Sequence, residues 1–255
     1  GTVIVGGDTR TSFNLFNKIV TAELLYLGFD VINIGKVPTP TVQQTIRHHQ
    51  ASGGICITAS HNPIEWNGLK FMNKEGSFLN ESEYQTFTEK IHSQYPANYV
   101  SWDKIGQEIV YNNAIEDHIA KICNVIDLKA IKAANLNILV DTNNGAGCQS
   151  TPFLLDKLGV NYKLLHPEGN GLFSHNPEPS KENLTALIHE MKENNYDVGF
   201  AQDADADRLV IIDENGSFIG EDNSLAFCME SILAENQSDK ENQIVVNLST
   251  SLVIE

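Results

Sequence analysis

The chain repeats one local plan, in which a short strand, an Asp-Thr pair at a turn, a helical stretch, a Leu-Gly pair and a second strand follow one another. In the first copy the strand covers residues 2–5, helical spacing of apolar residues covers 13–27, and the next strand covers 31–34. In the second copy the strand covers 136–141, the helix ends at Leu158, and the next strand covers 160–165. Such alternation predicts mostly parallel sheets with helices on both faces, and functional sites at the carboxyl ends of strands.

This repetition predicts an α/β fold class of repeated three-layer α/β/α domains with mostly parallel (mixed) sheets. A length of 255 residues exceeds one ordinary compact core and fits two domains with part of a third. A polar stretch near 100–130 interrupts the pattern, so we expect a first domain at 1–115 and a second at 116–240. A further strand-like segment begins at 243, and we expect 241–255 to be the truncated start of a third domain in a fragmentary chain.

The balance of charges excludes some classes of partner. The 17 Lys and Arg residues face 33 Asp and Glu residues, and the formal charge of -16 opposes binding to nucleic acid or to anionic lipid. No segment approaches the roughly 20 apolar residues of a membrane span. The four cysteines have no CxxC spacing and are typical of free thiols in a reducing compartment. We therefore expect a cytoplasmic protein with neither a nucleic-acid nor a membrane partner.

Two short strings carry the clearest chemistry. The first, Thr58-Ala59-Ser60-His61-Asn62-Pro63, lies at the end of an apolar strand at 53–58. The second, Asp203-Ala204-Asp205-Ala206-Asp207-Arg208, follows a strand at 196–200. A serine in a polar turn can carry a phosphoryl group, and alternate carboxylates can hold the hard cation that neutralises it.

The spacing of the three aspartates restricts how they can share one ion. On a regular strand the outer carboxylates, those of Asp203 and Asp207, would be about 13 Å apart. Opposed ligands of a magnesium ion are only about 4 Å apart, and a helix would turn the middle carboxylate to the opposite face. The segment must therefore curl if all three bind one ion, and a solvated acidic turn remains the alternative.

Other chemistries fit these residues less well. An EF-hand loop counted from Asp203 would need glycine where Arg208 stands, and an aspartyl-phosphate phosphatase would need Thr or Val two residues after its second Asp. Ser60 lacks the glycines of a hydrolase nucleophile elbow. The residues favour a serine that receives and returns a phosphoryl group, with cations and a proton carrier supplied by Arg10, His61, Lys70 and Arg208.

Four other loops suggest no chemistry by themselves. The turns at 6–10 and 143–147 match neither a P-loop nor GxGxxG. The proline-containing segments at 37–40 and 175–179 are predicted to be rigid loops, and His175 has no partner at a ligand spacing along the chain.

These motifs resemble the α-D-phosphohexomutase superfamily, which includes phosphoglucomutase, phosphomannomutase and phosphoglucosamine mutase. The matching segments stand in the family's order and approximate spacing: Gly7-Asp8-Thr9-Arg10, residues 58–63 with Asn67-Gly68-x-Lys70, the turn at 141–147, and residues 203–208. The resemblance implies a phosphoserine loop in the first domain and a metal-binding loop in the second. It also implies that a sugar-recognition domain and a distal phosphate-binding domain lie beyond residue 255, so we expect the fragment to be inactive alone.

The resemblance further implies a role for each candidate residue. Ser60 would be the phosphorylated serine, and Mg²⁺ would be held by Ser60, Asp203, Asp205 and Asp207. Arg10 and His61 would screen the phosphoryl group, Lys70 would be the general acid/base, and Arg208 could support either task. The enzyme would exchange phosphate between C1 and C6 of a hexose phosphate through a hexose 1,6-bisphosphate.

Two rival functions remain at this stage, a magnesium-dependent phosphatase that works through an aspartate and a sugar-phosphate sensor that kept the motifs. The sugar itself, glucose, mannose or glucosamine, and the oligomeric state cannot be deduced from these residues.

Overall fold

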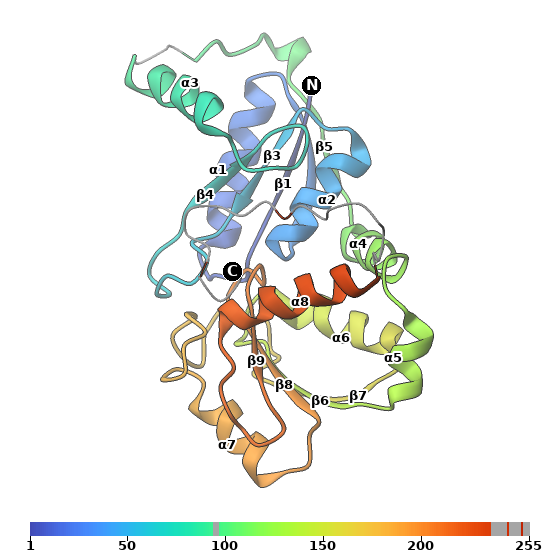
Figure 1. The fold of residues 1–255 in the computed structure, drawn as a ribbon. Coiled ribbons are helices and arrows are strands. Elements are labelled where there is room, and N and C mark those ends of the chain that lie inside the picture. Colours follow the sequence, from blue (N-terminus) through green and yellow to red (C-terminus); the bar gives the residue numbers. More distant parts are fainter. Residues whose placement is uncertain (94–96, 236–243, 245–250, 252–255) are drawn as a thin grey trace.

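The computed structural model describes residues 1–93, 97–235, 244 and 251, and Figure 1 shows two sheets, each flanked by helices, one above the other. Both sheets are mostly parallel, which confirms the predicted fold class. The expected third domain at 241–255 lies, except for residues 244 and 251, outside the described residues. The boundary between residues 115 and 116 stays a prediction.

The first sheet has five strands in the order β4-β3-β1-β2-β5. β1 (Thr2–Gly7) pairs in parallel with β2 (Asp30–Lys36) and with β3 (Gly53–Ile57). β5 (Glu108–Val110) is parallel to β2, and β4 (Leu69–Met72) is antiparallel to β3. All five residues of β3 are buried, as expected for the continuous small and apolar run in its sequence.

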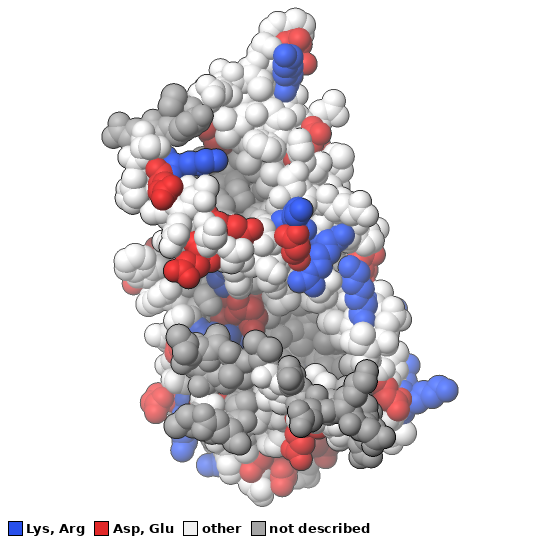
Figure 2. Space-filling view, turned by 45° about the horizontal axis from the view of Figure 1, so that its top comes forward, with Lys and Arg blue, Asp and Glu red and all other residues white. Residues whose placement is uncertain are grey.

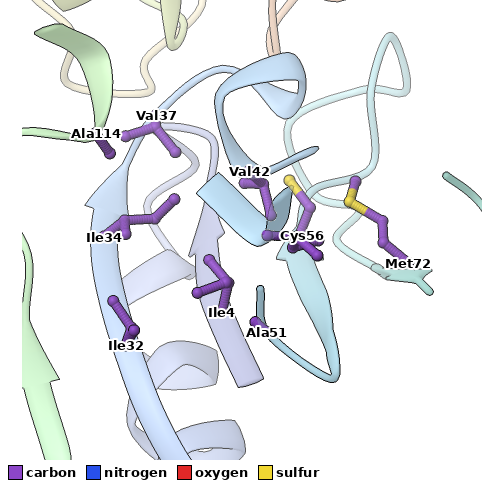
Figure 3. Packing of buried hydrophobic residues seen from close by; sticks show 10 residues of the cluster. Ile4, Ile32, Ile34, Val37, Val42, Ala51, Cys56, Met72 and Ala114 are labelled. Atoms are coloured by element: carbon purple, nitrogen blue, oxygen red, sulfur yellow. The ribbon is translucent and has the colours of Figure 1, made fainter. Parts of the chain in front are cut away.

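Helices cover both faces of this sheet because successive strand side chains point to opposite faces. On one face α1 (Phe13–Tyr26) packs against Val5 and Val31. On the other face α2 (Thr39–His49) contributes Val42 to the core in Figure 3, which also contains Ile4, Ile32, Ile34, Ala51, Cys56 and Met72. After β4 come α3 (Glu81–His92) and a short 3₁₀ turn, η1 (Trp102–Lys104).

The second sheet has four strands in the order β7-β6-β8-β9. β6 (Asn137–Asp141) is parallel to β7 (Asn161–Leu165) and β8 (Val198–Gln202), and β9 (Leu209–Ile212) is antiparallel to β8. One face packs on α5 (Leu128–Ala134) and α6 (Gly147–Leu158), the other on α7 (Thr185–Glu193). The last described helix, α8 (Glu221–Glu235), contacts β9.

The repeat between the two domains extends beyond the strand–helix–strand segments that the sequence predicted. In the first sheet the central strand β1 has parallel partners on each side, and one of them, β3, is followed by a loop and the antiparallel strand β4. In the second sheet β6 is the central strand, and β8 is followed in the same way by the antiparallel strand β9. An isolated bridge then forms after a turn in both copies, between Met72 and Phe78 and between Ile212 and Phe218. Phe218 is thus joined to β9 by a single bridge.

The loop after β3 and the loop after β8 occupy equivalent places in this repeat.

The two domains contact each other through α4 (Ala114–Cys123), which packs on both α2 and α6 and lies between the sheets in Figure 1. A hydrogen-bonding contact between Thr41 Oγ1 and His118 Nδ1, at 3.0 Å, joins α2 to α4. The domains are therefore in direct contact on the side where the carboxyl ends of their strands meet.

Charged side chains of both signs are distributed over the surface. On the face shown in Figure 2, basic and acidic side chains are interspersed, and the described residues form no continuous basic surface there. Within the part of the chain that the structure describes, every helix is too short or too polar to cross a membrane.

Candidate active site

Ser60 and the aspartate string meet across the two domains. Ser60 follows β3, Asp203 follows β8, and the hydroxyl Oγ of Ser60 donates to Asp203 Oδ2 at 3.0 Å. The two residues are 143 positions apart in sequence. The shared location follows from the repeat, because both loops leave the carboxyl end of an equivalent parallel strand.

The aspartate string curls, as its spacing requires. Ala206 has a φ of 51°, in the left-handed region, and its N–H donates to the Asp203 carbonyl oxygen at 3.1 Å. Asp203 Oδ1 accepts the backbone N–H groups of Asp207 and Arg208, both at 3.2 Å. As a result one carboxylate oxygen from each of Asp203, Asp205 and Asp207 lies within 4.8 Å of the others.

Lys70 projects from β4 into this group of carboxylates. Its Nζ lies 2.7 Å from Asp205 Oδ2 and 2.9 Å from Asp207 Oδ2. Burial by itself would lower the pKa of Lys70, but the two carboxylates outweigh burial and raise this pKa above its usual value. Lys70 is consequently a charged ammonium group that donates to both carboxylates.

Thr39 is a member of the site that the sequence analysis missed. At the start of α2, its N–H donates to the Asp205 carbonyl oxygen at 3.0 Å, and its hydroxyl donates to Asp205 Oδ2 at 2.5 Å. The prolines at 37–40 predict only a rigid loop for this segment. The one feature of the sequence that could have indicated Thr39 as a site residue is its position between two prolines, Pro38 and Pro40.

The donor set fits a hard divalent cation. Asp203 and Asp205 are fully buried, and Asp205 Oδ1 has no hydrogen-bond partner among the described residues. Burial, together with the neighbouring Asp205 and Asp207, raises the pKa of Asp203. Burial acts in the same direction on Asp205, but Lys70 and Thr39 lower the pKa of that carboxyl overall. Three crowded carboxylates with an unpaired oxygen match the all-oxygen coordination that Mg²⁺ prefers.

Arg10 is buried and hydrogen-bonds to the backbone of the Ser60 loop. The side chain is 0% exposed, its Nε donates to Asp8 Oδ2 at 3.1 Å, and the Phe173 ring lies 5.1 Å from the guanidinium carbon. Its two terminal nitrogens donate, at 2.7 to 3.0 Å, to four backbone carbonyl oxygens, those of Ser60, Asn62, Pro63 and Trp66.

This geometry changes the expected role of Arg10. A guanidinium group has five N–H donors, and all five are engaged here. Arg10 therefore has no N–H left to screen a phosphoryl group on Ser60, contrary to the expectation from the resemblance. Its task in this structure is to fix the backbone of the loop.

A buried carboxylate completes this support. Asp8 Oδ2 accepts from Thr58 Oγ1 at 2.6 Å, and Thr58 Oγ1 in turn accepts the N–H of Ser60 at 2.9 Å. Burial raises the pKa of Asp8 to about 6, against the opposing effects of Thr58 and Arg10. Ser60 itself has a φ of 49°, a conformation that a non-glycine residue adopts only when its surroundings hold it there.

His61 and Arg208 share a second partner that was also missed, Glu178. The Nη1 of Arg208 donates to Glu178 Oε1 at 3.1 Å, and the Nε2 of His61 lies 3.4 Å from Glu178 Oε2. Arg208 Nε also lies 3.5 Å from Asp203 Oδ2. Glu178, like Thr39, stands between two prolines in a loop that was predicted only to be rigid.

Ser60, His61 and Arg208 border an open cleft between the domains, with a volume of about 520 Å³. Its wall combines a hydroxyl nucleophile, two cationic or titratable side chains and an aromatic ring, a set suited to a phosphorylated polar ligand. The lining residues are Thr39, Pro40, Gln43, Ser60, His61, Phe78, Asp207 and Arg208.

Comparison with known proteins identifies the family of both domains. The family model described as phosphoglucomutase/phosphomannomutase, alpha/beta/alpha domain I, matches residues 1–98, and the model of domain II matches 116–216. A phosphoglucomutase/phosphomannomutase from Thermococcus kodakarensis is 38% identical over 99% of this chain and 55% of its own length. A Methanococcoides burtonii protein named "Probable phosphoglucosamine mutase" is 36% identical, with the same coverage of 99% and 55%.

A solved structure shows the same fold. The phosphoglucomutase/phosphomannomutase family protein from Burkholderia thailandensis has a TM-score of 0.77 and 25% identity, over 92% of this chain and 51% of that one. The chain thus spans about half the length of the curated relatives that it matches. Its two domains, in the family's order, show that it belongs to the phosphoglucomutase/phosphomannomutase family.

Proposed function

We propose that the whole protein is a phosphohexomutase that interconverts hexose 1-phosphate and hexose 6-phosphate through phospho-Ser60 and a bisphosphorylated sugar. The observation that carries this proposal is the contact of Ser60 Oγ with Asp203 Oδ2, at 3.0 Å, beside two further carboxylates. A serine so placed can hold a phosphoryl group next to the ligands of a cation. The family membership of both domains supports the same reaction.

In the proposed reaction, the bond between phosphorus and Ser60 Oγ breaks while a bond forms from phosphorus to a hydroxyl oxygen of the hexose phosphate. Ser60 Oγ takes up a proton as the phosphorus leaves it, and the sugar hydroxyl gives its proton to the group that supplied that one. The bisphosphorylated sugar then turns over, and its other phosphoryl group returns to Ser60. A magnesium ion held by Ser60, Asp203, Asp205 and Asp207 would neutralise charge on the phosphoryl oxygens.

The protein side chains have separate tasks in this proposal. Lys70, whose ammonium group donates to Asp205 and to the cleft-lining Asp207, serves as the proton carrier for the sugar hydroxyl. His61 and Arg208 border the cleft and bring positive charge toward the phosphoryl group, and Glu178 orients both. Arg10 acts through the loop backbone and is a positioning residue.

The protein is further proposed to act in the cytoplasm, with hexose phosphates rather than nucleic acids or membranes as its partners. The sugar-recognition and distal phosphate-binding parts are proposed to belong to the remaining half of the whole protein. The domain boundaries 1–115 and 116–240 are retained in this proposal.

The test is intact-mass spectrometry of the full-length protein before and after phosphatase treatment, for wild type, Ser60→Ala and the matched control Ser82→Ala, which changes an exposed helix residue. We expect wild type and the control to lose one phosphate, and Ser60→Ala to carry none. Steady-state assays on glucose, mannose and glucosamine phosphates would then identify the sugar. Mutase activity that survives Ser60→Ala, or a phosphate analogue trapped on an aspartate, would contradict the proposal.

A further inference from the structure

A second group of metal-ligating atoms lies in the second domain, outside the site of Ser60 and Asp203. One ligand atom from each of Asp141, His166 and His175 lies within 4.8 Å of the others. The residues come from the end of β6, the end of β7 and the long loop that precedes α7. His175, for which the sequence showed no partner at ligand spacing, therefore has two partners in space.

The two imidazole rings approach the same carboxylate from different sides. His166 Nδ1 lies 2.9 Å from Asp141 Oδ1, and His175 Nε2 lies 3.2 Å from Asp141 Oδ2. Asp141 is 1% exposed, whereas the His166 and His175 side chains are 28% and 14% exposed. The carboxylate is buried, yet its histidine partners border solvent, so a small ion and a water molecule can reach the group.

The contacts of His175 direct its Nε2 toward the carboxylate. Its Nδ1 lies 2.8 Å from the carbonyl oxygen of Asn176, so Nδ1 must carry a proton. In a neutral ring Nε2 then has a lone pair, which would face the negatively charged Asp141. Nε2 and the Asp141 carboxylate therefore face one another as two ligands of one ion would.

The internal repeat offers a comparison for the Asp141 carboxylate. Asp8 and Asp141 are equivalent residues, and each accepts a backbone N–H two positions further on, that of Arg10 and that of Asn143. The buried Asp8 faces the permanent charge of Arg10. Among the described residues, Asp141 has only imidazoles as ion-pair partners, and these are neutral or charged according to their surroundings.

The loop that carries His175 is held in position independently of these rings. The buried side chain of Asn143 donates to the His175 carbonyl oxygen at 3.1 Å and accepts the N–H groups of Ser174 and His175 at 2.8 and 3.3 Å. His175 is thus fixed at both its backbone N–H and its carbonyl. Such preorganisation lowers the cost of assembling a ligand set.

We propose that Asp141, His166 and His175 form a second metal site, for a borderline divalent cation such as Zn²⁺, separate from the all-oxygen magnesium site. Two imidazole nitrogens and one carboxylate are a ligand set that zinc accepts, with water as a fourth ligand. Tetrahedral zinc with bonds near 2.0 to 2.1 Å places its ligands about 3.3 Å apart, and the three ligand atoms here lie within 4.8 Å of one another, so they need to approach by at most about 1.5 Å to close on one ion. The bound ion would anchor the loop that also carries Glu178.

The experiment uses the full-length protein after removal of metals by a chelator, with excess Mg²⁺ present to occupy the carboxylate site. Zn²⁺ alone is titrated by calorimetry, and X-ray absorption spectra are recorded with substoichiometric zinc. The test variant is His166→Gln with His175→Gln, and the matched control is His189→Gln, an exposed residue of α7. Unfolding temperatures in the chelator report whether each variant remains folded.

We expect wild type and His189→Gln to bind one zinc with a spectrum that contains two imidazole ligands and no sulfur. The double variant should lose this binding phase and the zinc-induced rise in unfolding temperature. A sulfur shell would assign the zinc to a thiol, such as the exposed Cys228, and would overturn the proposal. An all-oxygen shell, no imidazole-bound zinc in wild type, or unchanged binding in a folded double variant would overturn it equally.

Discussion

Replacement of Arg10 by lysine separates two roles that an arginine beside a phosphoserine can have. Lysine keeps the positive charge, but it offers three N–H donors where Arg10 uses five. At least two of the acceptors around Arg10 must therefore lose their donor. A hydrogen bond to a charged group contributes about 1.5–3 kcal/mol, so the loss of two such bonds in Arg10→Lys should lower the free energy of unfolding by about 3–6 kcal/mol.

The assay is urea unfolding of the dephosphorylated protein, which has no phosphoryl group to screen. With a urea dependence of about 2 kcal/mol per M for a domain of this size, the expected loss moves the midpoint by about 1 M or more. The matched control is Arg47→Lys. Arg47 is exposed and donates from Nε to one backbone carbonyl, that of Glu75, so its replacement should change stability by less than about 0.5 kcal/mol.

Equal unfolding midpoints for Arg10→Lys and Arg47→Lys would refute the argument from the hydrogen bonds. If, in addition, Arg10→Lys slowed phosphorylation of Ser60, the arginine would act on the phosphoryl group, as the family resemblance first implied. A loss of stability that is present before any phosphate is attached supports the positioning role. Activity alone could not distinguish the two roles, because both predict a slower enzyme.

Three further predictions test the support of the site. Gly171→Ala should lower the urea midpoint by the equivalent of more than about 1 kcal/mol, because φ is +74° and the added Cβ would lie 2.1 Å from the Thr9 carbonyl oxygen; an unchanged midpoint would refute this. Burial, with a smaller effect of Lys121, lowers the pKa of His118 from 6.5, so below about pH 6.5 the unfolded chain takes up a proton that the folded chain resists. Stability should therefore fall as pH falls in that range, and His118→Gln should weaken this dependence while the exposed His92→Gln should not. Asp205→Asn should abolish the rise in unfolding temperature caused by Mg²⁺, and a retained rise would exclude Asp205 as a ligand.

The local parts of this fold could be predicted from the sequence because they depend on neighbours along the chain. Buried strands such as 53–57 are continuous apolar runs, and the curl of residues 203–208 follows from the distance that one ion can bridge. The positions of Ser60 and Asp203 at strand ends follow in the same way. None of these inferences requires knowledge of how the domains contact each other.

The residues that were missed or reassigned depend on contacts between distant segments. Thr39 and Asp205 are 166 positions apart, and their contact exists only because α2 of one domain faces a loop of the other. The role of Arg10 could not be deduced from its own motif either, since its acceptors are carbonyl oxygens about 50 residues away. Backbone acceptors have no sequence signature, so a charged side chain bonded to them resembles a free one.

Part of the cluster of Asp141, His166 and His175 could have been predicted from the order of the strands. Asp141 ends β6 and His166 follows β7, and the predicted parallel pairing of these strands brings their carboxyl ends together. Spacing along the chain does not reveal such a neighbour, because the two residues lie on different strands. Only His175, which comes from a long loop, required the structure.

The internal repeat allows the stabilisation of the loops after β3 and β8 to be compared. The loop after β8 has six residues, 203–208, before β9 begins, and Asp203 closes it with its own carboxylate by accepting the N–H groups of Asp207 and Arg208. The equivalent loop after β3 has eleven residues, 58–68, and a single side chain within it cannot reach so many backbone groups. Arg10 supplies four of the missing bonds from outside the loop. Loss of Arg10 should therefore disorder the serine loop while the aspartate loop keeps its shape, which leaves metal binding less affected than phosphorylation.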